Sequence, residues 1–320
     1  MKTKFWNTCL KYVDAYDLVY LLCVVSRCGS APNRAGAKML VTGAKNYGTI
    51  GGGRSEFLLV EKAKKIVSES AFVKPQLCIL DHRDDDSPNA SGMICSGSQT
   101  YALIPLTKKD KLTIENITKT YKNGESAVLT LSPRGLFIDP CLVSQTVPFS
   151  FEQTDNEQWK YKEQIGVSDK LYIVGGGHCS LALSKLTTEI GFYTTVYENR
   201  SSIQAFDDNI YANEKIVVDY DDLPSLIPDS DKTFITIMTY GHAYDQYVLE
   251  KLVHKKVRYL GMMGSMNKVR SVYDNLIKKG IAKELLLKVH APIGIDIGSD
   301  TPEEIAISIA AQLIKLRNKY

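Results

Sequence analysis

The sequence has few of the features that mark a secreted, membrane-bound or metal-binding protein. Seven cysteines, an odd number, are spread over 320 residues with no Cys-x-x-Cys pair, so neither a disulfide framework nor a zinc knuckle is indicated. The longest wholly apolar run, Leu18 to Val25, has eight residues, far fewer than the ~20 that a membrane helix needs. We therefore expect a cytoplasmic protein with free thiols and no membrane partner.

Strong charge and catalytic signatures are missing as well. The 39 Lys and Arg against 36 Asp and Glu leave a net charge of +3, too small and too dispersed to predict a nucleic-acid partner. Three consecutive aspartates, Asp84 to Asp86, lack the alternating spacing and the glycine of a calcium loop. Because no Ser-His-Asp order or paired-carboxylate spacing stands out, we predict no catalytic residue and no metal site.

Length and patterning indicate two domains. The chain of 320 residues exceeds the roughly 100–200 residues of a typical domain. In residues 1–150, the polar turn CGSAPNRAGA between two strand-like runs, Leu18 to Ser26 and KMLVTG, predicts a hairpin. Further along, an apolar stripe at Leu59, Ala63 and Ile66 has helical spacing. We predict an α/β domain at 1–150 and, from its polar and charged composition, a linker at 151–169.

Residues 170–320 have a different pattern, in which strand-like runs alternate with helical segments. Such alternation is typical of a doubly wound parallel sheet. Near the end of the chain, Thr301 as a cap, Pro302 at the first helical position and Glu304 at the third predict the start of a helix. The second domain is therefore expected to be Rossmann-like.

A glycine triplet in this domain follows a predicted strand and opens a predicted helix. Gly175, Gly177 and Ser180 occupy the three positions of the dinucleotide-binding fingerprint. Glu198, at the end of the next strand, is placed to hold a ribose hydroxyl and favours an unphosphorylated ribose. Because glycine-rich turns also occur in doubly wound domains that bind no cofactor, a nucleotide site and an empty turn both remain open.

Other turns of the second domain offer further candidates. Gly264 and Ser265 stand at a strand-to-helix turn whose N–H groups suit an anion. An NAD-dependent oxidoreductase would also need a proton donor, and His178, His242 and His290 each lie beside a glycine or proline turn. A turn or surface histidine is the simpler interpretation of each. Hydride transfer is thus an alternative function for this domain.

The first domain contains a second glycine triplet. Gly51, Gly52 and Gly53 precede a predicted helix that has Glu56 in its first turn. The glycines indicate a sharp turn, whose N–H groups could also hold an anion. Glu56 would stabilise the helix start whether or not it contacts a ligand. A tight turn and an anion site are both compatible with this motif.

Arg34 and Cys95 complete the candidates of the first domain. Arg34 lies in the turn SAPNRAGA, where it reaches either a phosphate or water. Cys95 is followed by Ser96 and Gly97 in a predicted turn, unlike the cysteines within strand-like runs. A reactive or sulfur-binding thiolate and an inert half-buried thiol are both open for Cys95.

Several segments together resemble one known family. VVSRCGSAPNRAGAKMLV, GTIGGGRSE and GMICSGS in the first domain, and LYIVGGGHCSLAL, RYLGMMGSMNKV and HAPIGIDIGSDTPEEIAISIAAQLI in the second, are similar in order and spacing to the xanthine dehydrogenase accessory proteins of the XdhC/CoxI type. From the first to the last, the segments span nearly the whole length of the chain. The long closing run makes the resemblance more specific than either glycine triplet does.

The resemblance implies an N-terminal XdhC/CoxI-type domain, a C-terminal Rossmann domain and a role as a maturation chaperone. Such a chaperone binds the molybdenum cofactor (molybdopterin), protects it while a cysteine desulfurase supplies its terminal sulfur, and inserts it into an apo molybdenum hydroxylase such as xanthine dehydrogenase. The implied cofactor-binding positions are Arg34, Gly51, Gly52, Gly53, Glu56 and Cys95 in the first domain, and Gly175, Gly177, His178, Glu198, Gly264 and Ser265 in the second. A homodimer, and a nucleotide or NAD in the Rossmann domain, are further expectations.

Three positions depart from the family pattern. Asn33 stands where an arginine is usual, Ser96 replaces a glycine after Cys95, and Tyr240 replaces a histidine, which leaves His242. These differences affect the expected anion ligands more than the fold. A third hypothesis is a pure adaptor that bridges the sulfur donor and the hydroxylase without binding a small ligand.

Overall fold

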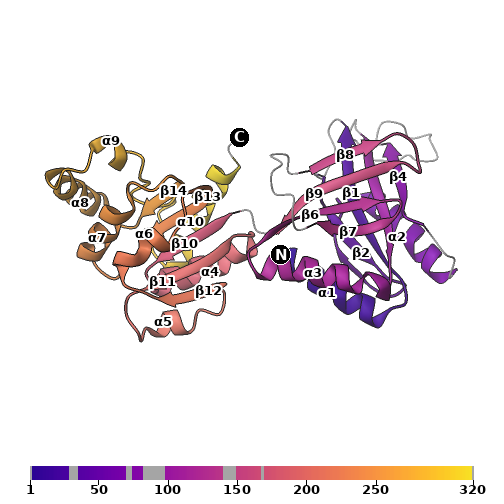
Figure 1. Ribbon diagram of the computed structural model, residues 1–320, viewed down its shortest axis with the longest axis horizontal. Helices are drawn as coiled ribbons and strands as arrows, with labels where there is room; N and C mark the ends of the chain where they lie inside the picture. The colour runs from indigo at the N-terminus through magenta and orange to yellow at the C-terminus, as the bar shows by residue number, and fades with distance from the viewer. Residues whose placement is uncertain are drawn as a thin grey trace. The chain divides into compact units, whose positions relative to one another are not determined.

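The computed structural model describes residues 2–28, 35–69, 74–81, 98–139, 149–166 and 169–318. The chain divides after Gly166 into two compact units (Figure 1). The first contains α1 (Lys2–Ala15), β1 (Val19–Cys28), β2 (Lys38–Val41), β3 (Asn46–Gly48), α2 (Gly53–Ser68), β4 (Gln76–Asp81), β5 (Ser98–Leu106), the 3-10 helix η1 (Lys108–Asp110), α3 (Lys111–Lys122), β6 (Ser126–Ser132), β7 (Gly135–Asp139), β8 (Phe149–Gln153) and β9 (Trp159–Gly166). The second contains β10 (Lys170–Val174), α4 (His178–Glu189), β11 (Tyr193–Glu198), α5 (Gln204–Asp207), β12 (Glu214–Val217), η2 (Tyr220–Asp222), α6 (Leu223–Leu226), β13 (Ser230–Ile237), α7 (His242–Leu252), β14 (Val257–Met262), α8 (Met266–Lys278), α9 (Lys283–Leu286) and α10 (Pro302–Arg317). Among these helices, none combines the length and the apolar character needed to cross a membrane.

The first unit is built on two antiparallel sheets. One has the strand order β3-β2-β1-β5-β4 and the other the order β7-β6-β9-β8. The predicted hairpin near the start of the chain is confirmed, because β1 pairs antiparallel with β2 and Tyr20 lies opposite Val41. With α1, α2 and α3 packed on these sheets, the mixed α/β character predicted for this domain is also confirmed.

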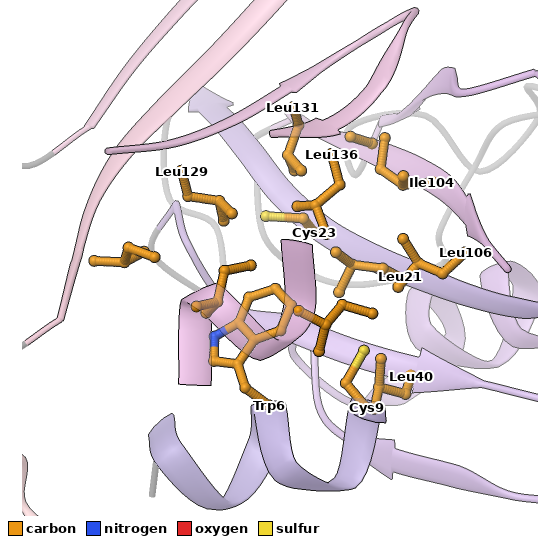
Figure 2. Packing of buried hydrophobic residues seen from close by; sticks show 14 of the residues in the cluster. Trp6, Cys9, Leu21, Cys23, Leu40, Ile104, Leu106, Leu129, Leu131 and Leu136 are labelled. Carbon is orange, nitrogen blue, oxygen red and sulfur yellow. The ribbon is translucent and has the colours of Figure 1, made fainter. Parts of the chain in front are cut away.

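Strand β1 is central to the first unit because both of its faces are covered. Leu21 contributes to a core that α1, α3 and the second sheet complete, whereas Tyr20 contributes to a core against α2. A strand buried on both faces has a continuous apolar sequence, which explains the longest apolar run of the chain. Figure 2 shows Trp6 and Cys9 of α1 packed in the same core as Leu21.

The segment 151–169, expected to be a linker, instead belongs largely to the second sheet of the first unit. Strand β9 lies within it and pairs with both β6 and β8. Its apolar residues Trp159, Tyr161 and Ile165 are buried, whereas the side chains between them are polar and more exposed. A strand covered on one face alternates in this way, so its polar composition does not indicate a linker. The first unit extends to Gly166.

The second unit contains one parallel sheet of five strands. The strand order is β12-β11-β10-β13-β14, and all neighbouring strands are parallel. The predicted Rossmann-like, doubly wound domain is therefore confirmed. The direction of strand succession reverses between β10 and β13, and in such sheets ligands bind at the carboxyl ends of the two strands beside this reversal.

Helices cover both faces of the parallel sheet. Helices α4 and α10 lie side by side (Figure 1) and form one core with Leu171 and Ile173 of β10. Helices α7 and α8 cover the other face, where Val174 and Ile235 are buried. Strand β10 is apolar on both faces because it is covered on both.

The first part of the closing run, before α10, is a loop that is hydrogen-bonded to this helix. Thr301 caps α10 by accepting a hydrogen bond from the Glu304 N–H (3.3 Å), and the Glu304 carboxylate accepts one from the Thr301 N–H (3.1 Å). The predicted helix start is therefore confirmed. In the loop, Gly294 donates its N–H to Gln312 of α10 (2.9 Å) and accepts a hydrogen bond from the same amide (3.0 Å). These bonds attach the loop to the last helix.

Leu21 offers a test of the core of the first unit. Because its side chain is fully buried, we expect Leu21→Ala to lower the free energy of unfolding of this unit by about 2–5 kcal/mol. Leu112→Ala on α3, where the leucine is 66% exposed, is the matched control and should change it by less than about 0.5 kcal/mol. Both tryptophans, Trp6 and Trp159, lie in this core, so urea denaturation followed by tryptophan fluorescence measures the effect. Equal losses in the two variants would contradict the packing.

Candidate functional site

A cavity of about 220 Å³ lies at the carboxyl end of the parallel sheet. Residues that follow four of the strands line it: Gly177, His178, Cys179 and Ser180 after β10, Arg200 after β11, Met238, Thr239 and Tyr240 after β13, and Met263 after β14. It therefore lies at the reversal of strand order, where open α/β sheets bind ligands. We take this cavity as the candidate functional site.

The three glycines after β10 have different structural requirements. Gly175 has a φ of +114°, and a Cβ there would lie 2.3 Å from the carbonyl oxygen of Met238, so only glycine fits. A Cβ at Gly176 would lie 2.8 Å from the Phe206 ring. A Cβ at Gly177 would meet nothing within 4 Å. Packing thus demands the first two glycines, and the third leaves the start of α4 accessible from the cavity.

Glu198 at the end of β11 is fully buried. Its Oε2 accepts hydrogen bonds from the Gly176 N–H (2.7 Å) and Arg200 Nη2 (2.9 Å). Its Oε1 accepts from the N–H groups of Asn199 (3.0 Å) and Arg200 (3.2 Å) and from Arg200 Nε (2.9 Å). Burial raises the pKa of this carboxyl, but the hydrogen bonds from Arg200 and Gly176 outweigh burial and hold the pKa below its usual value. The carboxylate binds the chain's own donors, and its contact with a ribose stays a prediction.

The guanidinium of Arg200 lines the cavity and is held from two sides. Besides its two bonds to Glu198, its central carbon lies 3.9 Å from the ring centroid of Tyr240, a stacking geometry that suits arginine. The side chain retains 35% exposure. Arg200 was not among the predicted site residues. Its place just after the acidic end of the second strand is nevertheless a signal, since Rossmann domains put a phosphate-binding arginine near this position.

The first turn of α4 provides further groups suited to an anion. Gly177 caps this helix of 12 residues without a side-chain hydrogen bond, and the N–H groups and the dipole of a helix start attract negative charge. Ser180 lines the cavity, is 1% exposed, and its hydroxyl oxygen has no hydrogen-bond partner in the described part of the chain. An unsatisfied buried hydroxyl is unusual in a native protein, which makes Ser180 a candidate ligand contact.

Sulfur-containing side chains form much of the apolar lining. Cys179, Met238 and Met263 all line the cavity. Burial raises the pKa of the Cys179 thiol, and the nearby Glu303 carboxylate raises it further. The neutral thiol is therefore favoured, and Cys179 is suited to polarizable packing rather than to nucleophilic attack.

The turn at Gly264 and Ser265 is linked to the cavity by a buried ion pair. Ser265 caps α8 by accepting a hydrogen bond from the Lys268 N–H (3.3 Å). The Lys268 ammonium pairs with Asp245, which is fully buried. Asp245 also accepts hydrogen bonds from the N–H (2.9 Å) and the hydroxyl (2.8 Å) of Thr239, a residue of the cavity wall. Gly264 and Ser265 themselves do not line the cavity.

The glycine triplet of the first unit is closed by Glu56. All three glycines at 51–53 have positive φ angles, which confirms the predicted sharp turn. The Oε2 atom of Glu56 accepts hydrogen bonds from the hydroxyl of Thr49 (2.6 Å) and the N–H groups of Ile50 (2.9 Å) and Gly52 (3.0 Å). Burial raises the pKa of Glu56, but these hydrogen bonds lower it more. Donors expected to hold a foreign anion therefore hold a carboxylate of the chain.

The remaining candidates are dispersed. Arg34 and Cys95 lie outside the described residues, and their roles stay predictions. His178 is exposed at the start of α4 and lines the cavity. His242 begins α7 outside the cavity lining, and His290 stacks on a tyrosine ring. Of the three histidines, the structure brings His178 into the candidate site.

Two family models match the chain, one in each unit. A model described as the XdhC Rossmann domain matches residues 171–313, and a model of the XdhC and CoxI family matches residues 14–74. The chain belongs to the XdhC and CoxI family. The cavity lies in its XdhC Rossmann domain, and the turn closed by Glu56 lies in its XdhC/CoxI part.

Similar proteins extend the match over nearly the whole chain. A probable xanthine dehydrogenase subunit of Bacillus subtilis (strain 168) is 23% identical over 321 residues, which cover 91% of each chain. The uncharacterized protein YqeB of Escherichia coli (strain K12) is 28% identical over 157 residues, which are 48% of this chain but only 28% of YqeB. A crystal structure of a xanthine dehydrogenase from Bacillus halodurans has a TM-score of 0.72 at 25% identity and covers 99% of this chain and 96% of its own.

Glu198→Gln tests the ion pair of this XdhC Rossmann domain. At neutral pH we expect the free energy of unfolding to fall by about 1.5–3 kcal/mol, since hydrogen bonds to a charged group are weakened. The pKa of Glu198 is lower in the folded chain, so its stabilisation is complete above the unfolded pKa of about 4.3 and is lost as the pH falls through the folded value. The difference between parent and variant should therefore shrink below about pH 4.

Urea denaturation of both proteins at several pH values measures this difference. Glu189→Gln on α4, where the glutamate is exposed, is a suitable control. A difference between parent and Glu198→Gln that stays constant with pH would contradict the charged pair.

Proposed function

We propose that this protein is an accessory factor of a xanthine dehydrogenase-type molybdenum hydroxylase and that it binds the molybdenum cofactor. It protects the cofactor, presents it to a cysteine desulfurase for addition of the terminal sulfur, and inserts it into the apo enzyme. The observation that carries the proposal is membership of the XdhC and CoxI family through matches in both units. Relatives named for xanthine dehydrogenase support the identity of the enzyme served.

The cavity of the Rossmann unit fits the phosphate-bearing end of this cofactor. Arg200 and the first turn of α4, which includes Ser180, line one space, and a guanidinium and helix-start N–H groups are the kinds of donor that bind phosphate. The volume of about 220 Å³ is below the ~300–1,000 Å³ of a pocket that encloses a whole drug-sized ligand. These residues would therefore hold one end of the molecule.

The chemistry of the other walls is compatible with a sulfur-rich ligand. Cys179, Met238 and Met263 line the cavity, and such soft side chains suit sulfur and soft metals. When bound, the cofactor supplies the molybdenum centre that the hydroxylase needs. The part of this chain is to hold the ligand and to shield it from water.

Gly177→Val provides the direct test of cofactor retention. A side chain at Gly177 enters open space at the cavity, so it should block the ligand and leave folding intact. We expect the parent protein, mixed with released cofactor and passed over a desalting column, to carry pterin that is detected by fluorescence after oxidation. Retention by Gly177→Val should fall about tenfold or more, as for loss of one good ligand contact.

Gly241→Val is the matched control, because Gly241 also caps a helix after a parallel strand but does not line the cavity. Its retention should equal that of the parent. Pterin that elutes only with small molecules for the parent protein would exclude cofactor binding. Equal retention by Gly177→Val and Gly241→Val would place the cofactor elsewhere in the chain.

Cys95 is the proposed sulfur contact in the first domain, on the ground that it matches the cysteine of the family's Met-x-Cys-Gly-Gly stretch. We expect Cys95→Ser to weaken cofactor retention in the same desalting assay, because a hydroxyl is a poor ligand for a soft metal. Cys141→Ser is the control, since Cys141 lies outside the segments that resemble the family. Unchanged retention by Cys95→Ser would make Cys95 a structural thiol.

An NAD-dependent oxidoreductase is the second candidate function. The position of the cavity at the reversal of strand order and the exposed His178 in its lining favour it, since a nicotinamide enzyme needs a nucleotide site and a proton donor. Calorimetric titration with NAD and NADH tests it, and the absence of heat with both at millimolar concentration would remove it.

A further inference from the structure

The carboxylate that Rossmann domains use to select NAD is turned inward in this protein. In such domains an acidic residue at the end of the second strand accepts hydrogen bonds from the ribose hydroxyls. Here Glu198 has no exposed surface and already accepts five hydrogen bonds, from Gly176, Asn199 and Arg200. A ribose diol would find no acceptor on this side chain. The group that lines the cavity at this position is Arg200.

The guanidinium of Arg200 is held ready to bind an anion. Its Nε and one Nη2 hydrogen donate to Glu198, so three of the five N–H groups of an arginine are directed away from that carboxylate. Stacking on Tyr240 at 3.9 Å fixes the plane. A guanidinium fixed in this way loses little conformational entropy when it binds an oxyanion.

A second and independent feature of the same cavity points to an anion. The start of α4 supplies N–H groups and a positive dipole end. Next to it, the Ser180 hydroxyl is buried and has no hydrogen-bond partner among the described residues. The guanidinium of Arg200 and the N–H groups of the helix start together could satisfy several oxygens at once. A ligand group with three terminal oxygens matches this set better than the two of a phosphodiester.

We propose that Arg200 makes this cavity selective for a ligand that carries a phosphate monoester, and that Glu198 and Tyr240 position the guanidinium. The proposal rests on the proposed function, in that the cavity binds the phosphate-bearing end of a ligand. A monoester has a charge near −2 and three strong acceptor oxygens. Selectivity for a monoester is the opposite of the preference for an unphosphorylated ribose that Glu198 predicts from the sequence.

Two sources can supply this chemistry, a 2′-phosphate on a dinucleotide and a terminal phosphate on a mononucleotide or pterin. Isothermal titration of the full-length protein with two matched pairs, NADP with NAD and GMP with guanosine, distinguishes them. In each pair only one member carries the monoester. We expect the phosphorylated member of at least one pair to bind about 10- to 100-fold more tightly, as for a hydrogen-bonded charge pair.

Arg200→Gln should remove this preference by weakening the phosphorylated ligand about 10- to 100-fold while leaving its partner unchanged. Arg270→Gln, on the exposed face of α8 away from the cavity, is the matched control and should retain the preference. Since Arg200→Gln leaves the buried Glu198 without its ion-pair partner, Tyr240→Leu provides a second variant. Tyr240 is 49% exposed, so the fold should persist, and the preference should fall several-fold, as for loss of a cation–π contact.

Equal affinity for both members of both pairs in the parent protein would overturn the proposal. So would a preference that persists in folded Arg200→Gln, or no binding of NADP and GMP at millimolar concentration. A protein that retains molybdenum cofactor but shows no monoester preference would refute the role of Arg200 and leave the proposed function standing. A protein that does not retain molybdenum cofactor but still prefers GMP to guanosine would refute the proposed function and leave the role of Arg200 standing.

Discussion

Both glycine turns of this protein depend on a glutamate carboxylate that accepts the N–H of the middle glycine. Gly52 donates to Glu56 at 3.0 Å and Gly176 donates to Glu198 at 2.7 Å. Successive glycines in a sharp turn direct their N–H groups inward, and buried N–H groups need acceptors. In the first turn the acceptor belongs to the helix that the turn opens. In the second it belongs to the neighbouring strand, so that carboxylate joins two elements of the sheet.

Two buried carboxylates join neighbouring turns at the carboxyl edge of the Rossmann sheet. Glu198 ties the turn after β10 to Arg200 after β11, and Asp245 ties Thr239 after β13 to Lys268 in α8. A buried charge is tolerated only when it is paired and hydrogen-bonded, and each of these carboxylates is. The walls of the cavity are therefore fixed before any ligand arrives, which is the condition for selective recognition of a small anionic group.

Patterns with a local cause were predicted well. The antiparallel hairpin, the alternation of the Rossmann unit and the capping box of α10 all follow from neighbours in the chain. The sequence of strand β9 instead predicts a linker, because a strand covered on one face contains few apolar residues. Helix α1 was not predicted, although Trp6, Cys9 and Val13 recur at helical spacing. Lysines and an aspartate lie around these apolar positions, so the short apolar stripe does not stand out in the sequence.

The sequence by itself determined the family, the Rossmann architecture and the glycine turn after β10 that borders the candidate site, because periodicity, caps and glycine spacing are read within a few residues. Only the tertiary structure decided what the acidic residues do. Glu198 has the spacing of a ribose ligand, yet it bonds to Gly176 and Arg200, and Arg200 in turn stacks on Tyr240 from another strand end. Partners for a charged side chain depend on distances between strands that are remote in sequence, and no spacing along the chain encodes them.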